Sequence, residues 1–417
     1  MNTRVVSHPR AATAFFIGTL FFAYAFMQRV SPSVMTEELM LAFSVGGGAL
    51  GALSGWYFYA YAAMQLPVGI LTDRFGPRKL MAAAAFFCGL ATLAMALSSS
   101  LLTASVSRAL IGGTVGFGFV GTLAIASYFF PAKRFAFLAG ILQCVGMLGA
   151  IAGQAPLRLV VELYGWRIML GALAAFGILL ALACLFVIPK RPEKNAPVSG
   201  NAGLFSGLYD VISRPQSWIC AGIGFGMTSI MLGFAALWAV PWLSNIQGYS
   251  KPVAAGLASC VFLGWAIFAP IVGWFSDLVG RRKPIVLLGC LCNLIVFSIL
   301  LYTTPDRTIW LIACLFLLGI SGSTVTVMFG AVRELNSVNS ASTALGLLNM
   351  CIMASGAIMQ PAVGVLLDYF WGGLEASGIP LYQASTYASA LSVLIVANLI
   401  ALVCIVGLRE TFCRQSE

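Results

Sequence analysis

The chain has 417 residues, of which 60% are hydrophobic and 9% are charged, and its formal net charge is +10. A mean hydropathy of +0.96 excludes a water-soluble globular protein, because so few polar side chains cannot cover its surface. The apolar runs are long and continuous, which favours membrane-spanning helices over a membrane β-barrel, whose strands alternate apolar and polar residues. The composition therefore predicts an integral membrane protein embedded in a lipid bilayer.

Twelve apolar segments follow one another along the chain, each long enough, at roughly 20 residues, to cross a hydrocarbon core. We predict spans at 11–35, 46–71, 80–98, 101–130, 136–158, 167–189, 217–244, 252–275, 284–303, 308–332, 341–370 and 385–408. A polar stretch broken by Pro and Gly separates the first six from the last six. We therefore expect an all-α membrane protein with an N-terminal six-helix bundle at 1–189, a linker at 190–214 and a C-terminal six-helix bundle at 215–417.

Lysine and arginine are distributed unevenly between the two sets of loops. Seventeen of them lie at the termini and in the loops after even-numbered spans, whereas four lie on the other side. Because cytoplasmic loops are enriched in basic residues, this asymmetry predicts that both termini are cytoplasmic. The basic residues lie in short loops without interleaved aromatic residues, so we expect no nucleic acid partner. The loops also lack an Asn-x-Ser/Thr glycosylation site, which favours a bacterial inner membrane.

One loop sequence occurs twice. Residues 69–79 and 273–283 both read G-x-x-x-D-x-x-G-x-R-K, and matched positions are 204 residues apart. This repeat predicts two similar halves in tandem. The aspartate can accept hydrogen bonds from N–H groups at a helix N-terminus, or pair with an arginine of a neighbouring helix, and so hold one half against the other. Alternatively, the basic residues of these loops only fix the topology.

With two such loops at corresponding places among twelve spans, the chain resembles the major facilitator superfamily, whose signature loop after the second helix reads G-x-L-a-D-r-x-G-r-[KR]. The resemblance covers the whole chain. It implies two pseudo-symmetric six-helix bundles that transport a small molecule by alternating access, as a monomer and without a cofactor. In that family the loop holds the cytoplasmic side closed in the outward-facing state, which implies gating roles for Asp73, Arg74, Arg78, Asp277, Arg281 and Arg282.

Two arginines lie within predicted spans, where a charge costs about 2.5–3.5 kcal/mol on insertion scales and is usually functional. Arg29, together with Tyr24 and Gln28, resembles first-helix patterns of organic-anion members of the superfamily. Alternatively, Arg29 extends to the outer membrane interface. Arg108 begins an R-x-x-x-G-x-x-x-G sequence that resembles the fourth-helix motif of the family, in which the arginine is structural, linked to proton transfer or in contact with substrate.

Polar and aromatic residues at helical spacing provide further candidates for substrate contact. Tyr57 and Tyr61 lie on one face of the second span, and Asn349 and Gln360 lie on one face of the eleventh. The remaining candidates are Gln143 and Trp238. For the aromatic residues the alternative is helix packing or an interfacial belt.

These observations predict a secondary transporter of a small organic anion or zwitterion, such as a carboxylate, an amino acid or a peptide. No acidic residue lies clearly at the midplane of the membrane. We therefore expect a symporter or antiporter that works either by anion exchange or by symport with a proton carried by the substrate. One alternative is a drug or metabolite efflux antiporter, although the fifth span lacks the Gly-Pro pair of drug antiporters. A non-transporting receptor is a further alternative. With one histidine, and neither a hydrolase set of residues nor a metal cluster, we expect neither an enzyme nor a metal site.

Overall fold

The computed structural model describes residues 10–131, 134–190, 204–303, 307–336, 340–376 and 378–413, without the side chains of residues 66, 70, 73, 136, 204–208, 341, 342 and 376. The first half contains α1 (Ala11–Val30), the 3₁₀-helix η1 (Ser31–Val34), α2 (Thr36–Phe43), α3 (Gly47–Phe75), α4 (Pro77–Ala96), α5 (Leu101–Phe129), α6 (Phe135–Ala152), α7 (Ala155–Tyr164) and α8 (Trp166–Val187).

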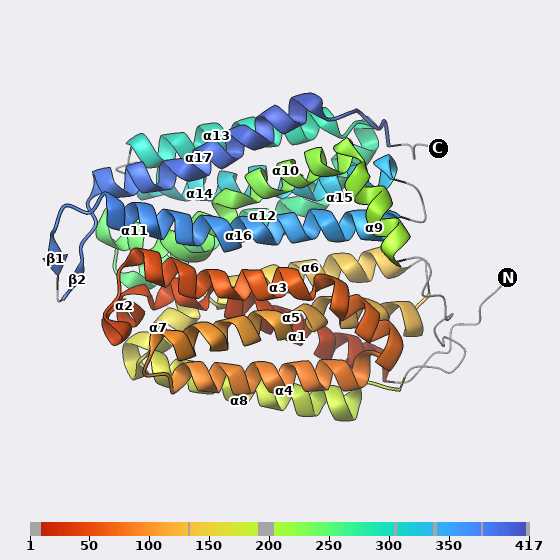
Figure 1. Ribbon diagram of the computed structural model, residues 1–417, viewed down its shortest axis with the longest axis horizontal. Coiled ribbons are helices and arrows are strands. Elements are labelled where there is room, and N and C mark those ends of the chain that lie inside the picture. The colour runs from red at the N-terminus through yellow and green to blue at the C-terminus, as the bar shows by residue number, and fades with distance from the viewer. Residues whose placement is uncertain are drawn as a thin grey trace.

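The second half is also helical apart from one short hairpin. It contains α9 (Leu204–Ser213), α10 (Pro215–Ser229), the π-helix η4 (Ile230–Trp238), α11 (Ala239–Asn245), α12 (Lys251–Val279), α13 (Lys283–Thr303), α14 (Thr308–Ser323), the 3₁₀-helix η5 (Thr324–Thr326), α15 (Val327–Leu335), α16 (Ala341–Tyr369), β1 (Glu375–Ala376), β2 (Ile379–Pro380) and α17 (Ala384–Gly407). Figure 1 shows α1 to α8, in red to yellow-green, on one side and α10 to α17, in green to blue, on the other.

The predicted membrane helices are confirmed. Among the described residues, eleven helices or helix runs are long and apolar enough to span a membrane, and the bent pair of α2 and α3 can account for a twelfth. Several predicted spans are less regular than expected. The fifth breaks into α6 and α7 at Gly153 and Gln154, and the seventh contains the nine-residue π-helix η4. The linker predicted at 190–214 contains a helix, because its residues 204–213 form α9.

The two ends of the bundle are distinguished by their loops. We call the end with α2, β1 and β2 the hairpin end, and the opposite end, with the repeated loops, the basic-loop end (Figure 1). The repeated loops share a backbone feature that explains their second glycine. Gly76 ends α3 with φ of 76° and Gly280 ends α12 with φ of 69°, conformations that favour glycine.

Helices α3 and α16 run side by side between the two halves (Figure 1), and glycines allow their close approach. A Cβ atom at Gly51 would overlap the carbonyl oxygen of Gln360, and one at Gly364 would overlap the carbonyl oxygen of Gly47. Nearer the middle of the pair, a Cβ at Gly356 would meet the ring of Phe58 at 2.8 Å. Small residues are the usual means by which membrane helices pack closely. This contact therefore joins the two halves from the hairpin end to the centre of the bundle.

Candidate functional site

Arg29 and Arg108 lie beside the same tyrosine ring in the first half. The Arg29 guanidinium carbon is 6.0 Å from the ring centroid of Tyr57, and that of Arg108 is 5.0 Å from it. Arg29 also lies 4.2 Å from the ring centroid of Phe26 and 5.6 Å from that of Tyr61. Both arginines are buried, with 4% and 0% of their surface exposed. The structure thus brings four predicted residues of the first half into one cluster, namely Arg29, Tyr57, Tyr61 and Arg108.

The local sequence explains how this cluster is held. A Cβ at Gly112 would overlap the carbonyl oxygen of Tyr57, so this glycine lets α5 approach α3 closely one turn after Arg108. The Arg108 Nη1 atom then donates a hydrogen bond of 2.8 Å to the carbonyl oxygen of Gln28. The Tyr57 hydroxyl donates to the carbonyl oxygen of Ala25 at 3.0 Å. These contacts between α1, α3 and α5 fix the Arg108 guanidinium and the Tyr57 ring, beside which Arg29 lies.

Neither arginine forms an ion pair with any carboxylate of the described side chains. The ion pairs among the described side chains involve other basic residues, namely Arg158, Arg214, Lys251 and Arg282. The Nε atom of Arg29 and the Nε and Nη2 atoms of Arg108 are buried without a hydrogen-bond partner. Buried charges are normally paired, so two uncompensated cations favour an anion as their missing partner.

Tyr24 and Gln28 face a different neighbour. The Gln28 Nε2 atom donates to the Tyr24 hydroxyl at 2.7 Å and to the Thr92 hydroxyl at 2.8 Å, and Thr92 belongs to α4. The Tyr24 ring packs edge-on against Phe176 of α8 at 5.7 Å. These contacts lie within the first half. They give both residues a structural function, and their predicted contact with substrate stays a prediction.

The predicted residues of the second half are split between two places. The Gln360 side chain donates from Nε2 to the carbonyl oxygen of Leu232 in the π-helix at 2.7 Å. The backbone carbonyl oxygen of Gln360 accepts from Trp238 Nε1 at 3.1 Å. The Gln360 Oε1 atom is buried without a partner. Asn349 instead donates to Gln65 Oε1 of α3 at 2.8 Å and so joins the two halves. Gln143, in the first half, is exposed on α6, and no described contact joins it to the arginine cluster.

The second repeated loop forms an ion network within its own half. Arg282 bonds to Asp277 at 2.6 Å and to Glu334 of α15 at 2.7 Å, and the Glu410 carboxylate accepts from its backbone N–H at 2.8 Å. The hydrogen bond with Glu334 raises the pKa of Arg282, which therefore remains charged. Arg281 is exposed and lies 5.9 Å from the ring centroid of Phe412. In this conformation Asp277 thus binds inside the second half rather than across the halves.

The first repeated loop makes fewer described contacts. Arg78 donates from Nε to the carbonyl oxygen of Leu185 at the end of α8, at 2.7 Å. Arg74 is exposed, 5.3 Å from the ring centroid of Phe75. The side chain of Asp73 lies outside the described residues. The predicted gating functions of this loop therefore stay predictions.

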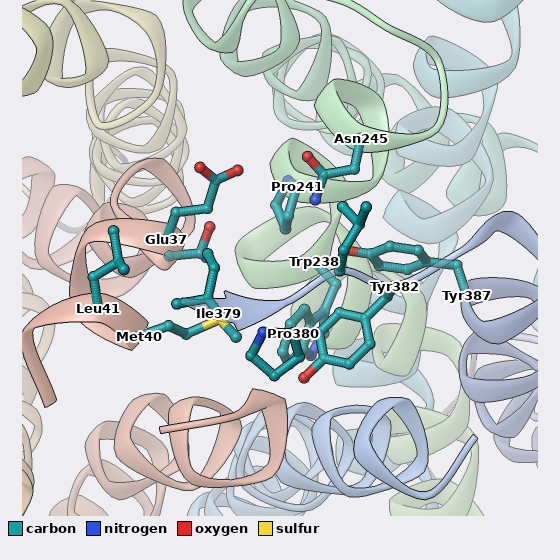
Figure 2. A pocket seen from close by; sticks show the side chains of 12 residues that line it. Glu37, Met40, Leu41, Trp238, Pro241, Asn245, Ile379, Pro380, Tyr382 and Tyr387 are labelled. Atoms are coloured by element: carbon teal, nitrogen blue, oxygen red, sulfur yellow. The ribbon is translucent and has the colours of Figure 1, made fainter. Parts of the chain in front are cut away.

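A cavity of about 330 Å³ lies at the hairpin end, between α2 of the first half and several elements of the second (Figure 2). Its walls are mostly apolar and aromatic, with Trp238, Tyr382 and Tyr387 on one side and Glu37 on the other. Glu37 also forms an ion pair of 2.6 Å with Lys251. Of this group the sequence analysis identified Trp238 alone, because the cavity depends on how α2 and the hairpin fold back over the helix ends.

Comparison with known proteins identifies the family. A model of the Major Facilitator Superfamily matches residues 17–360 and, a second time, 223–411. The chain belongs to the major facilitator superfamily. It is a membrane transporter rather than an enzyme. One solved structure of the superfamily fold, a bacterial homolog of the human lysosomal transporter Spinster in an inward-facing and unoccupied conformation, superposes with a TM-score of 0.76, 16% sequence identity and 96% coverage of both chains.

Relatives of this superfamily protein have names that point to small molecules. A putative tartrate transporter of Agrobacterium vitis is 24% identical, and the match covers 78% of this chain and 79% of the relative. A probable sulfoacetate transporter of Cupriavidus necator is 27% identical over 43% of this chain and 42% of the relative. A multidrug resistance protein of Mycobacterium tuberculosis is 24% identical over 72% of this chain and 65% of the relative. The substrate of a superfamily transporter such as this one is therefore a small molecule, and bacterial relatives are consistent with the inner membrane.

Proposed function

We propose that the protein is a secondary transporter of a small organic anion or zwitterion, such as a carboxylate. The observation that carries the proposal is the pair of buried arginines around Tyr57, whose Nε atoms have no hydrogen-bond partner. A guanidinium binds carboxylates through two parallel N–H···O bonds. A substrate carboxylate would supply the negative charge that this part of the first half lacks. The relatives named for tartrate and sulfoacetate support the same substrate class.

In the proposed cycle, residues 1–189 and 215–417 move as two bodies around the arginine cluster, with the basic-loop end in the cytoplasm. Arg29 holds the substrate anion, with Tyr61 beside it, and Arg108 contributes positive potential from behind Tyr57. From the second half, Gln360 and Trp238 would contribute to the substrate site. Opening at one end and then at the other would release the anion across the membrane. The aspartates and arginines of the two repeated loops would hold the basic-loop end closed in the alternate state.

The distribution of charged residues also bears on what drives the transport of the substrate. Among the described residues, the carboxylates that form ion pairs or interhelical bonds lie toward the two ends of the bundle, and none of them contacts the arginine cluster. We therefore propose exchange of one anion for another, or symport with a proton carried by the substrate. A drug efflux antiporter is the second candidate, favoured by the aromatic walls of the hairpin-end cavity and by the relative named for multidrug resistance.

Ligand-induced thermal stabilisation distinguishes these candidates. The purified protein would be melted in lipid nanodiscs with tartrate, other organic acids, amino acids and lipophilic cationic drugs. A ligand that binds only the folded protein raises the melting temperature according to its concentration relative to Kd. We expect organic acids to stabilise the protein and cationic drugs to leave it unchanged. Stabilisation by cationic drugs alone would reverse the proposed order of the two functions.

A further inference from the structure

The carboxylate of Asp368 connects the two halves at the hairpin end. Asp368 lies at the end of α16, and its oxygens accept from the backbone N–H of Gly47 at 2.8 Å and of Gly48 at 2.7 Å, at the start of α3. The Tyr382 hydroxyl also donates to Asp368 and accepts from the Gly47 N–H at 2.8 Å. Burial and the bond to Asp368 raise the pKa of Tyr382 well above its usual value, which keeps this donor protonated.

This contact provides the cap that α3 lacks within its own half. The first N–H groups of a helix have no partner inside the helix, and a carboxylate there is also favoured by the helix dipole. The residue that precedes α3 is Gly46, which supplies no side chain to cap it. A Cβ at Gly46 would lie 2.7 Å from Asp368 Oδ1, and one at Gly48 would lie 3.0 Å from Asp368 Oδ2. The run Gly46 to Gly48 therefore leaves the space that a carboxylate from the other half occupies.

Ion pairs reinforce the junction from a second direction. Lys251, the first residue of α12, bonds to Glu37 at 2.6 Å and lies 3.9 Å from Glu38, both on α2 of the first half. Glu38 in turn pairs with Arg158 of α7 at 2.7 Å. Arg158 also donates to the carbonyl oxygen of Val34 at 2.7 Å, which fixes the segment before α2. Two separate sets of contacts, around Asp368 and around Lys251, thus hold this end together.

The pairing of α3 with α16 relates this junction to the first repeated loop. The two helices are antiparallel, with Gly47 opposite Asp368 and Gln65 opposite Asn349. Continued along α3, the same register places position 73 opposite the first residues of α16. Each helix therefore carries an aspartate within its last three residues.

We propose that Asp368 and Tyr382, bound to Gly47 and Gly48, form the gate residues of the hairpin end, which we call the hairpin-end lock. The lock acts by positioning the two halves for transport. It stabilises the conformation that is closed at the hairpin end. Its hydrogen bonds must break each time the halves separate there, so the strength of the lock sets the population of molecules open toward the hairpin side. This inference does not depend on the identity of the substrate.

Hydrogen–deuterium exchange of the full chain in nanodiscs tests the proposal without a ligand. In Asp368→Ala, we expect amides at the start of α3, in peptides covering 44–50, to exchange roughly ten- to a hundredfold faster, the effect of losing hydrogen bonds to a charged acceptor. As molecules shift toward closure at the other end, peptides covering 66–76 and 340–349 should exchange more slowly. Glu375→Ala is the matched control, because the Glu375 side chain is exposed on β1 and makes no described hydrogen bond or ion pair.

The opposite responses of the two ends separate a gate from a merely structural cap. Faster exchange at both ends, or no change at either end, would overturn the proposal. If Asp368→Ala does not fold, Tyr382→Phe carries the same test, because it removes one donor and leaves the bonds from Gly47 and Gly48 to Asp368. We expect that variant to show the same opposite changes at smaller amplitude. Exchange identical to the unmodified protein in Tyr382→Phe would exclude Tyr382 from the lock.

Discussion

Replacing Arg29 by methionine should abolish anion binding without weakening the fold. The Arg29 charge is 4.2 Å from the Phe26 ring, a contact that contributes about 0.5–2 kcal/mol. The cost of placing a charge within the membrane is about 2.5–3.5 kcal/mol. Because no described carboxylate offsets this cost, the variant should melt at the same temperature as the unmodified protein or above it. Loss of two hydrogen bonds to a substrate carboxylate should weaken binding by about 3–6 kcal/mol, or roughly 10²- to 10⁴-fold.

Arg158 provides the matched control, because it is equally buried, with 5% of its surface exposed, but is paired. Arg158→Met leaves Glu38 without its 2.7 Å partner. We expect a loss of about 2–4 kcal/mol of stability, below the full cost for a buried pair because the Glu38 side chain is 24% exposed. Melting curves with and without organic anions would measure both effects. An Arg29→Met variant that melts as early as Arg158→Met and still binds anions would refute the reasoning.

Two further predictions concern helix packing and the second repeated loop. Gly112→Ala should destabilise the protein by about 1–3 kcal/mol, because the new methyl group would overlap the Tyr57 carbonyl oxygen. The control variant Gly113→Ala should melt at the same temperature as the unmodified protein, because the nearest neighbour of its Cβ would lie at 3.6 Å. Equal melting temperatures for these two variants would contradict the close approach of α5 to α3. Arg282→Ala should lower thermal stability by about 2–4 kcal/mol, whereas Asp277→Asn should cost less than about 1 kcal/mol, because the Asp277 side chain is 67% exposed. A larger loss in Asp277→Asn than in Arg282→Ala, measured by the same melting assay, would refute that order.

Much of the fold could be predicted because single-residue chemistry determines it. Long apolar runs predict spans, and the repeated loop predicts two related halves. Arg29 and Arg108 were identifiable because a charge within an apolar run is costly to place in the membrane and is therefore usually functional. The sequence did not reveal that both lie beside Tyr57, because this depends on the close approach of α3 and α5 at Gly112.

Other features depend on contacts between distant parts of the chain. The bond between Gly47 and Asp368 joins residues 321 positions apart, and only the register of α3 against α16 brings them together. Tyr24 is predicted to contact substrate together with Gln28 and Arg29, but the sequence does not indicate its described neighbours, Thr92 of α4 and Phe176 of α8. The π-helix η4 was not predictable because a uniformly apolar run carries no signal for its backbone hydrogen-bond pattern. Sequence periodicity identifies faces, and it does not identify the neighbour that each face meets.

Counterflow in proteoliposomes tests the central claim, that Arg29 binds a transported organic anion, most directly. Vesicles loaded with an unlabelled organic acid would be diluted into the labelled acid, so that uptake reports exchange through the protein without an imposed ion gradient. We predict exchange by the unmodified protein and by Gly113→Ala, and none above protein-free vesicles for Arg29→Met. Exchange at an unchanged rate in Arg29→Met, or exchange of cationic drugs with no exchange of any organic acid, would contradict the claim.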